Sequence, residues 1–382
     1  MEKAKSLLIY YSNRFLDGSL DYKINNKFGK IFRCYNQIID LGEKNLISQI
    51  NTKDFSEDSI MRYHFLAYDN EKYDHWATRD QVLSCFLKPK LKELSKIDNI
   101  NKMEKFINDY VTDLESYFRS FLNLLKKIDN NKYYYKLFSI LNLSANLYPL
   151  VIRLHNKNIL EDSLIINSNL TFLELIEIAD VRVYKTRGTD PQKDVYELAR
   201  RAKNMNNQNI EDELLSFINK FMNDRLFRNK LEEDIYGNQG LVYIFIEYSE
   251  KLRDDKKGKY SLNELKELNN NKSTRPTIEH IFAQEPRFEF PNRSFDSAEE
   301  YFSKINKLGN LTLLKKETNS KCQDKTPEEK IQSLDFYIKS PFDITSELAA
   351  EIKDRGNSFN KKDINKRTLD LADFCVKRWS YN

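Results

Sequence analysis

TIEHIFAQ, residues 277–284, and KLGNLTLLKKETN, residues 307–319, are the two segments that decide the fold of the C-terminal part of this chain. Each contains a short apolar run, at Ile278–Phe282 and at Leu311–Leu314, and these runs predict the first strands in the sequence. A helix-like segment follows each of them. We therefore expect a small α+β domain here, built on a two-stranded hairpin and a helix.

The polar residues of the two segments predict a site for phosphodiester hydrolysis. Glu279 and His280 are adjacent, and Asn310 and Asn319 follow in the second segment. A histidine whose pKa lies near neutrality can take a proton from water. A divalent cation held by oxygen ligands can neutralise the transition state and stabilise the leaving 3′ oxygen. This set of residues therefore combines a general base with a cation site.

Strand geometry limits how Glu279 and His280 share one site. Neighbouring side chains on a flat strand point to opposite faces, so the strand must end or bulge there. We expect His280 to face the scissile phosphate, with Glu279 and Asn319 as oxygen ligands of the cation. Asn310 is expected to hydrogen-bond the backbone of the connecting loop and so fix His280, while Gly309 permits a close backbone approach. Both residues also have a purely structural interpretation. Asn319 would be a helix N-cap, and His280 would be a half-buried histidine whose hydrogen bonds are all made within the protein.

The rest of the chain predicts helices and one connection. Up to about residue 250, glycine and proline are scarce and apolar residues recur at helical spacing, which is typical of a helical core. The clearest stripe consists of Phe106, Tyr110, Leu114, Tyr117, Phe118, Phe121 and Leu124. The predicted organisation is mostly α: a large α-helical region at 1–252, with room for two subdomains, a polar linker at 253–275, and the small α+β domain at 276–382.

Composition excludes several classes of protein. The chain has 382 residues, 40% of them hydrophobic and 31% charged, and no apolar stretch long enough to span a bilayer, so we expect no membrane partner. The N-terminus lacks the features of a signal peptide, which favours a cytoplasmic protein. The four cysteines are far apart, which argues against disulfides and against a structural zinc site.

The charge pattern leaves nucleic-acid binding open. The net charge is only +4, from 62 basic and 58 acidic residues, so DNA contacts must come from local clusters. Such a cluster surrounds the predicted helix that carries the cation ligand Asn319. It consists of Lys315, Lys316, Lys321, Lys325 and Lys330. Contact with DNA phosphates and a merely solvated helix face are equally good interpretations of it.

Other motifs give no second active site. His75, beside Asp74, is expected to have a surface or capping role, because an isolated motif of this kind is weak. The sequence has no phosphate-binding glycine loop and no Gly-x-Ser-x-Gly nucleophile elbow.

The two segments resemble those of the HNH, or ββα-metal, nucleases, and more closely those of the C-terminal nuclease domain of the GmrSD-type modification-dependent restriction family. The resemblance covers roughly the last 110 residues. Positions that also match the family are Lys330, Tyr337, Ser340, Arg367, Leu371, Ala372 and Trp379. The helical region is similar in character to the middle section of that family. One departure is Ala283, where the family usually has proline.

The resemblance implies a metal-dependent endonuclease acting on DNA, including modified foreign DNA, in a restriction or anti-phage system. It implies His280 as general base, Asn310 as structural asparagine, and Glu279 and Asn319 as ligands of Mg²⁺ or Mn²⁺. The candidate DNA contacts, Lys315, Lys316, Lys321 and Lys330, come from the charge pattern instead. Family members usually begin with a ParB-like, nucleotide-dependent domain, and its signature is absent here. We therefore expect a ParB-like, NTP-dependent partner subunit; the alternative is that this chain is the nuclease half of a longer gene product. The alternatives are a helical partner-binding subunit whose nuclease is silent alone, and an RNA-cleaving toxin.

Overall fold

The computed structural model describes residues 1–44, 46–47, 56–68, 81–96, 100–187, 191–292, 294–332, 336–356 and 358–381. The chain forms two compact units, each built from two separate stretches. The N-terminal unit comprises Met1–Ile176 and Pro191–Ser216, and the C-terminal unit comprises Glu177–Asp190 and Phe217–Asn382. The units divide within α8 (Phe172–Ala179) and α10 (Asn207–Met222). The domain limits predicted at 252 and 276 stay predictions.

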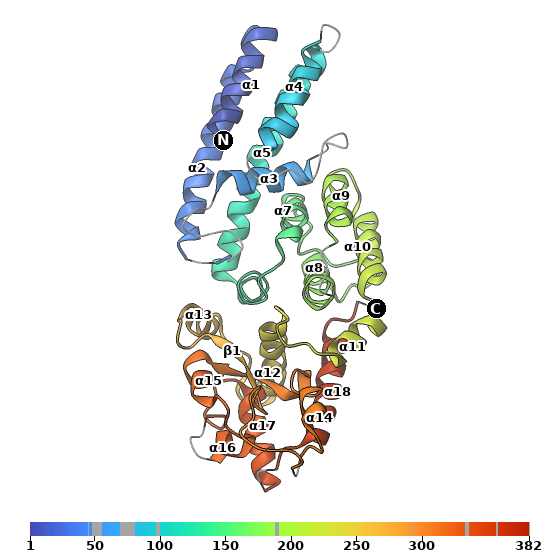
Figure 1. Cartoon of the computed structure of the whole chain (residues 1–382). Coiled ribbons are helices and arrows are strands. Elements are labelled where there is room, and N and C mark those ends of the chain that lie inside the picture. Colours follow the sequence, from blue (N-terminus) through green and yellow to red (C-terminus); the bar gives the residue numbers. More distant parts are fainter. Residues whose placement is uncertain are drawn as a thin grey trace. The chain divides into compact units, whose positions relative to one another are not determined.

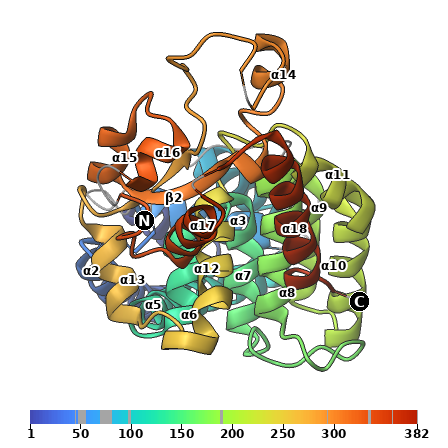
Figure 2. The same ribbon diagram turned by 90° about the horizontal axis from the view of Figure 1, so that it is seen from below.

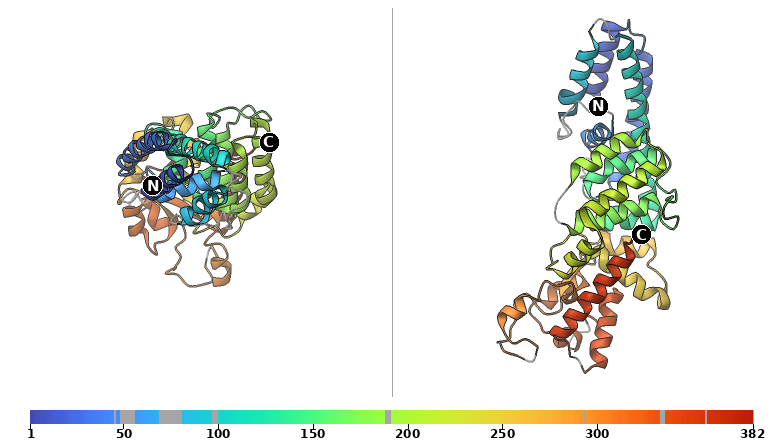
Figure 3. Two further views of the ribbon diagram at one scale, coloured as in Figure 1. Left: turned by 90° about the horizontal axis from the view of Figure 1, so that it is seen from above. Right: turned by 90° about the vertical axis from the view of Figure 1, so that its right-hand side faces the viewer.

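The N-terminal unit is helical in all its described elements (Figure 1). Besides its parts of α8 and α10, these are α1 (Glu2–Phe15), α2 (Asp21–Gly42), α3 (Glu57–Ala67), η2 (Leu83–Leu87), α4 (Lys88–Leu94), α5 (Ile100–Asn130), α6 (Lys132–Tyr135), η4 (Lys136–Ile140), η5 (Ala145–Leu147), α7 (Tyr148–Asn156) and α9 (Gln192–Ala202). The axis of the unit is α5, which has no glycine or proline and packs against α2 and α7. Figure 3 shows α1 and α2, in blue, running beside the blue-green end of α5.

The aromatic and aliphatic stripe predicted for the core lies on α5, and its members are buried, apart from the half-buried Phe106. The core prediction for this stripe is therefore confirmed. None of the described helices combines the length and the apolar composition that a membrane span requires. His75 lies outside the described residues.

The C-terminal unit carries the only sheet among the described residues, two antiparallel strands, β1 (Pro276–His280) and β2 (Leu311–Lys315). Its helical elements are η6 (Asp180–Thr186), α11 (Asp224–Glu232), α12 (Leu241–Lys257), α13 (Leu262–Asn270), α14 (Ala298–Phe302), η7 (Leu308–Asn310), α15 (Lys316–Cys322), α16 (Pro327–Gln332), α17 (Asp343–Asp354) and α18 (Lys361–Arg378). The mostly α chain with a small α+β part is as predicted. Residues 253–275, predicted as a linker, are largely helical in α12 and α13.

Buried leucines fix the position of the sheet within this unit. Leu311, Leu313 and Leu314 of β2 are at most 1% exposed, because α12 and α17 pack against the sheet (Figure 2). In register, Glu279 lies opposite Thr312, and His280 lies opposite Leu311. The helix α15 follows β2 directly and returns to contact β1. The order is therefore strand, long loop, strand, helix.

The first strand ends two residues earlier than predicted. The backbone N–H of Ile281 donates to the carbonyl oxygen of Asn310 at 2.8 Å, whereas the N–H of Phe282 donates to the side chain of Asn310 at 2.9 Å. The long connection contains α14 and buries Phe282, Phe295 and Tyr301 in the core of the unit.

Candidate active site

The end of β1 opens onto a surface pocket of about 600 Å³ that brings the predicted residues together. Glu279, His280 and Asn319 all line it, and Tyr236 forms part of its wall. Two neighbouring residues of a strand reach the same pocket because β1 ends at His280, so the alternation of faces stops there.

His280 is held between an amide and an aromatic ring. It is 7% exposed, its Nε2 lies 3.3 Å from Oδ1 of Asn306, and its ring centroid lies 4.3 Å from that of Tyr236. With Oδ1 of Asn306 as acceptor, Nε2 carries the proton and Nδ1 keeps the lone pair. Burial lowers the pKa of His280 to about 4, against which the hydrogen bond to Asn306 acts. The imidazole is therefore neutral at pH 7.

Glu279 forms a buried ion pair. Its Oε1 lies 2.8 Å from Nζ of Lys330 and accepts a hydrogen bond from the hydroxyl of Tyr337 at 3.2 Å. Burial raises the pKa of Glu279, and the ammonium of Lys330 opposes this rise. The same ammonium donates to the carbonyl oxygens of His280 at 2.6 Å and Ile281 at 3.2 Å. Lys330 thus fixes both the carboxylate and the backbone at the strand end.

Asn310 makes the backbone contacts expected of a structural asparagine. It is fully buried, and its Nδ2 donates to the carbonyl oxygens of Phe282 at 3.1 Å and Ile305 at 2.8 Å. Its Oδ1 accepts from the N–H of Phe282. The side chain therefore ties both ends of the long connection together, directly after His280.

Asn319 is anchored to the strand through its amide nitrogen. Nδ2 donates to Oγ1 of Thr277 at 3.0 Å and to the carbonyl oxygen of Ile278 at 2.8 Å. These bonds occupy the amide nitrogen, so the amide oxygen is the atom through which Asn319 can coordinate a cation. Since Asn319 lies inside α15, which begins at Lys316, the alternative role as N-cap does not apply.

A divalent cation fits this donor set, with few protein ligands. Glu279 offers a carboxylate oxygen and Asn319 an amide oxygen, which are the hard ligands that Mg²⁺ prefers. In the described part of the chain, no group of three or more His, Cys, Asp or Glu side chains is placed to hold a metal. Mg²⁺ is often bound by one or two carboxylates, with water and substrate phosphate completing the shell. The site therefore suits an ion that binds together with substrate.

The lysines predicted to contact DNA differ in exposure. Lys316 and Lys321 are exposed and Lys315 is half-buried. Lys330 is fully buried, and its ammonium is used by Glu279 and two backbone carbonyls. The prediction of Lys330 as a DNA contact is therefore corrected: this buried lysine holds Glu279 and the backbone at the end of β1 in place.

Tyr236 and Asn306 are site residues that the sequence did not reveal. Tyr236 belongs to the turn between α11 and α12, which precedes β1 by about forty residues, and no local pattern marks it. Asn306 stands four residues before Asn310 and directly precedes the segment 307–319. Its closeness to that segment in the sequence was the one signal that could have pointed to it.

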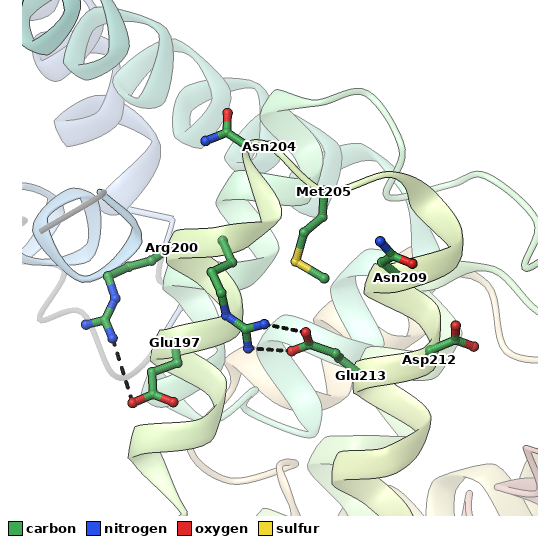
Figure 4. A pocket seen from close by; sticks show the side chains of 8 residues that line it. Glu197, Arg200, Asn204, Met205, Asn209, Asp212 and Glu213 are labelled. Carbon is green, nitrogen blue, oxygen red and sulfur yellow. Dashed lines mark hydrogen bonds and ion pairs between the residues drawn. The ribbon is translucent and has the colours of Figure 1, made fainter. Parts of the chain in front are cut away.

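The N-terminal unit has a larger pocket without comparable chemistry. Its volume is about 790 Å³, and α9 and α10 supply its charged lining (Figure 4). Arg201 pairs with both carboxylate oxygens of Glu213, and Arg200 lies 3.9 Å from Glu197. The arginines already have carboxylate partners, and the described lining contains neither histidine nor cysteine.

One comparison with known proteins identifies a family. Residues 221–374 match the family model described as GmrSD restriction endonucleases, C-terminal domain. The match includes both strands, all four predicted site residues and Tyr236. Searches among curated proteins and among solved structures found no significant match.

Proposed function

The C-terminal part of the chain belongs to the C-terminal domain family of the GmrSD restriction endonucleases, and from this premise we propose that the protein is a metal-dependent DNA endonuclease of the HNH, or ββα-metal, type. It is a nuclease component of a restriction system that acts against foreign DNA. The observation that carries the proposal is the pocket at the end of β1, which gathers His280, Glu279 and Asn319 between two strands and the following helix.

The proposed reaction uses His280 as general base. Its ring takes a proton from a water molecule, whose oxygen then forms a bond to the phosphorus as the bond to the 3′ oxygen breaks. Asn306 and Tyr236 hold the imidazole, and Asn310 holds the loop that follows it. Because Nε2 faces Asn306, Nδ1 is the nitrogen that takes the proton.

Glu279 and Asn319 are the residues we propose as holders of Mg²⁺ or Mn²⁺. When bound, the cation supplies positive charge to the phosphate and to the leaving oxygen. Lys330 orients Glu279 by pairing with one of its carboxylate oxygens. Lys315, Lys316 and Lys321 lie on the end of β2 and on α15, which starts there, and we propose that they contact DNA phosphates.

Removal of the metal tests this proposal. Purified protein is expected to nick or linearise supercoiled plasmid in Mg²⁺ or Mn²⁺ and to leave it intact in EDTA. Asn319→Ala, which removes one of two protein ligands, should raise the Mg²⁺ concentration for half-maximal rate by roughly tenfold. Ser303→Ala is the control, because Ser303 does not line the pocket and its hydroxyl already donates to the carbonyl oxygen of Glu300 at 2.7 Å.

Three outcomes would argue against the proposal as stated. Undiminished cleavage in EDTA would exclude metal dependence. Degradation of RNA with plasmid left intact would favour an RNA-cleaving toxin. Plasmid cleaved only after the product of a neighbouring gene is added would favour a nuclease that is silent alone; the comparisons give no support for a ParB-like partner.

A further inference from the structure

Tyr236 is an exposed aromatic residue placed on the proposed general base. It lies in the turn between α11 and α12, is 45% exposed, and lines the pocket of Glu279, His280 and Asn319. One part of its ring faces His280 at 4.3 Å between centroids, tilted by 59°. Its hydroxyl makes no hydrogen bond within the part of the chain that the structure describes.

The turn that carries Tyr236 is fixed on its N-terminal side. The N–H of Ile235 donates to the carbonyl oxygen of Asn306 at 3.1 Å, and Nζ of Lys307 donates to the carbonyl oxygen of Glu232 at 2.8 Å. Ile235 is buried, at 5% exposure. Because the backbone beside Tyr236 is held before any ligand binds, the ring needs little further ordering on contact.

We infer that Tyr236 contacts the substrate directly, by stacking its exposed ring surface on a nucleoside next to the scissile phosphate. This inference rests on the proposed function and names the group that seats the nucleic acid at that site. His280 faces the phosphate, so an aromatic ring in contact with His280 lies where the adjoining sugar and base pass. Every base that is unstacked from its neighbours offers a flat π-face to such a ring, which makes the contact tolerant of sequence.

A second role for Tyr236 would be to shield His280 from water. The two roles differ in what they change. A shield acts on the chemical step and so on kcat, whereas a stacking residue acts on affinity for DNA and so on Kd and KM. Binding measured without cleavage therefore separates them.

The experiment uses the full chain and a fluorescein-labelled oligonucleotide duplex with a short unpaired stretch at its centre, in EDTA, with anisotropy as the readout. Tyr236→Ala is expected to weaken binding by roughly tenfold, the scale of one base–aromatic stack. Tyr236→Phe should bind like the wild type, because the hydroxyl has no partner among the described residues. Phe302→Ala is the control: Phe302 is 50% exposed in the same unit and does not line the pocket. Thermal unfolding of each variant shows whether its fold is intact.

The possible results separate the stacking role from the proposed function. Tyr236→Ala protein that binds the duplex as tightly as wild type, with reduced kcat or unchanged cleavage, would overturn the stacking role alone, provided that His280→Ala abolishes cleavage. Equal weakening by Phe302→Ala would overturn it as well. Wild-type protein that neither binds nor cleaves DNA would overturn the proposed function together with this inference.

Discussion

The three acceptors around the ammonium of Lys330 explain how one residue organises the candidate site. An ammonium group has three donors, and in this protein they meet Glu279, the carbonyl oxygen of His280 and that of Ile281. Both members of the ion pair are almost fully buried. The loss of either charge would therefore leave the other unpaired in a medium of low polarity.

Substitution of Lys330 tests this at the residue scale. Lys330→Met keeps most of the side-chain length but removes the charge, and it is expected to destabilise the C-terminal unit by about 3 kcal/mol. It should also reduce cleavage, because Glu279 loses the partner that orients it. Chemical denaturation measures the first effect and plasmid cleavage the second.

The exposed Lys321 provides the comparison for Lys330. Lys321→Met should change the free energy of unfolding by no more than about 0.5 kcal/mol. Equal stability of the Lys330 and Lys321 variants would contradict the buried ion pair.

At the scale of elements, α18 packs closely against η7, the short helix directly before β2. A Cβ atom added to Gly309 would lie 2.0 Å from the carbonyl oxygen of Ile364 and 2.7 Å from the N–H nitrogen of Thr368. Arg367 of α18 donates to the carbonyl oxygens of Gly309 at 2.9 Å and Leu311 at 2.6 Å. The close backbone approach expected of Gly309 is confirmed, and the backbone that it approaches is that of α18.

Gly309→Ala is therefore expected to push α18 away from η7. The destabilisation should be about 2 kcal/mol or more, because the clash is with backbone that cannot rotate aside. Cleavage should fall as well, since Asn310 moves with the loop. Denaturation and plasmid cleavage provide the readouts.

Gly29→Ala is the matched substitution, and its effect should have the opposite sign. Gly29 lies inside α2, and apart from the backbone of that helix the nearest atom to its added Cβ is in the side chain of Arg33, 3.9 Å away. Alanine there should stabilise the helix by about 0.5–1 kcal/mol. If Gly309→Ala proved as harmless, the close packing of α18 on η7 would be wrong.

Local sequence patterns predicted the helices and strands better than they predicted the contacts between distant segments. The stripe on α5 and the apolar runs of β1 and β2 are local signals, so the helical region and both strands were accessible from the sequence. The helix α13 was missed within a polar segment, although Ser261 and Glu264 form a capping box that is visible as Ser-x-x-Glu. Tyr236 and Lys330 come to the site from distant segments, and a single sequence has no local signal for such contacts.

At the scale of the whole chain, the C-terminal unit depends on a segment that lies far upstream. Arg182 of η6 is buried, donates from Nε to the carbonyl oxygen of Trp379 at 2.9 Å, and pairs with Asp224 at 2.6 Å. Its guanidinium lies over the rings of Phe227 and Tyr381, at 4.8 and 4.7 Å. Arg182 and Trp379 both lie outside the segment 221–374 that matches the family.

Arg182→Met is expected to loosen the C-terminal end of the chain. The loss of a buried, paired guanidinium should cost about 3 kcal/mol and increase cleavage by protease after α18. Arg225→Met is the control, because Arg225 is exposed on the neighbouring helix α11. Identical proteolysis of the two variants would show that the upstream segment does not hold this unit together.

The proposed mechanism depends most on the role of His280 as general base. The direct measurement is the initial rate of supercoiled plasmid cleavage in Mg²⁺ by wild-type and His280→Ala protein, with melting temperatures recorded to verify that both are folded. Folded His280→Ala protein is expected to leave the plasmid intact. Cleavage by that variant at the wild-type rate would contradict the mechanism.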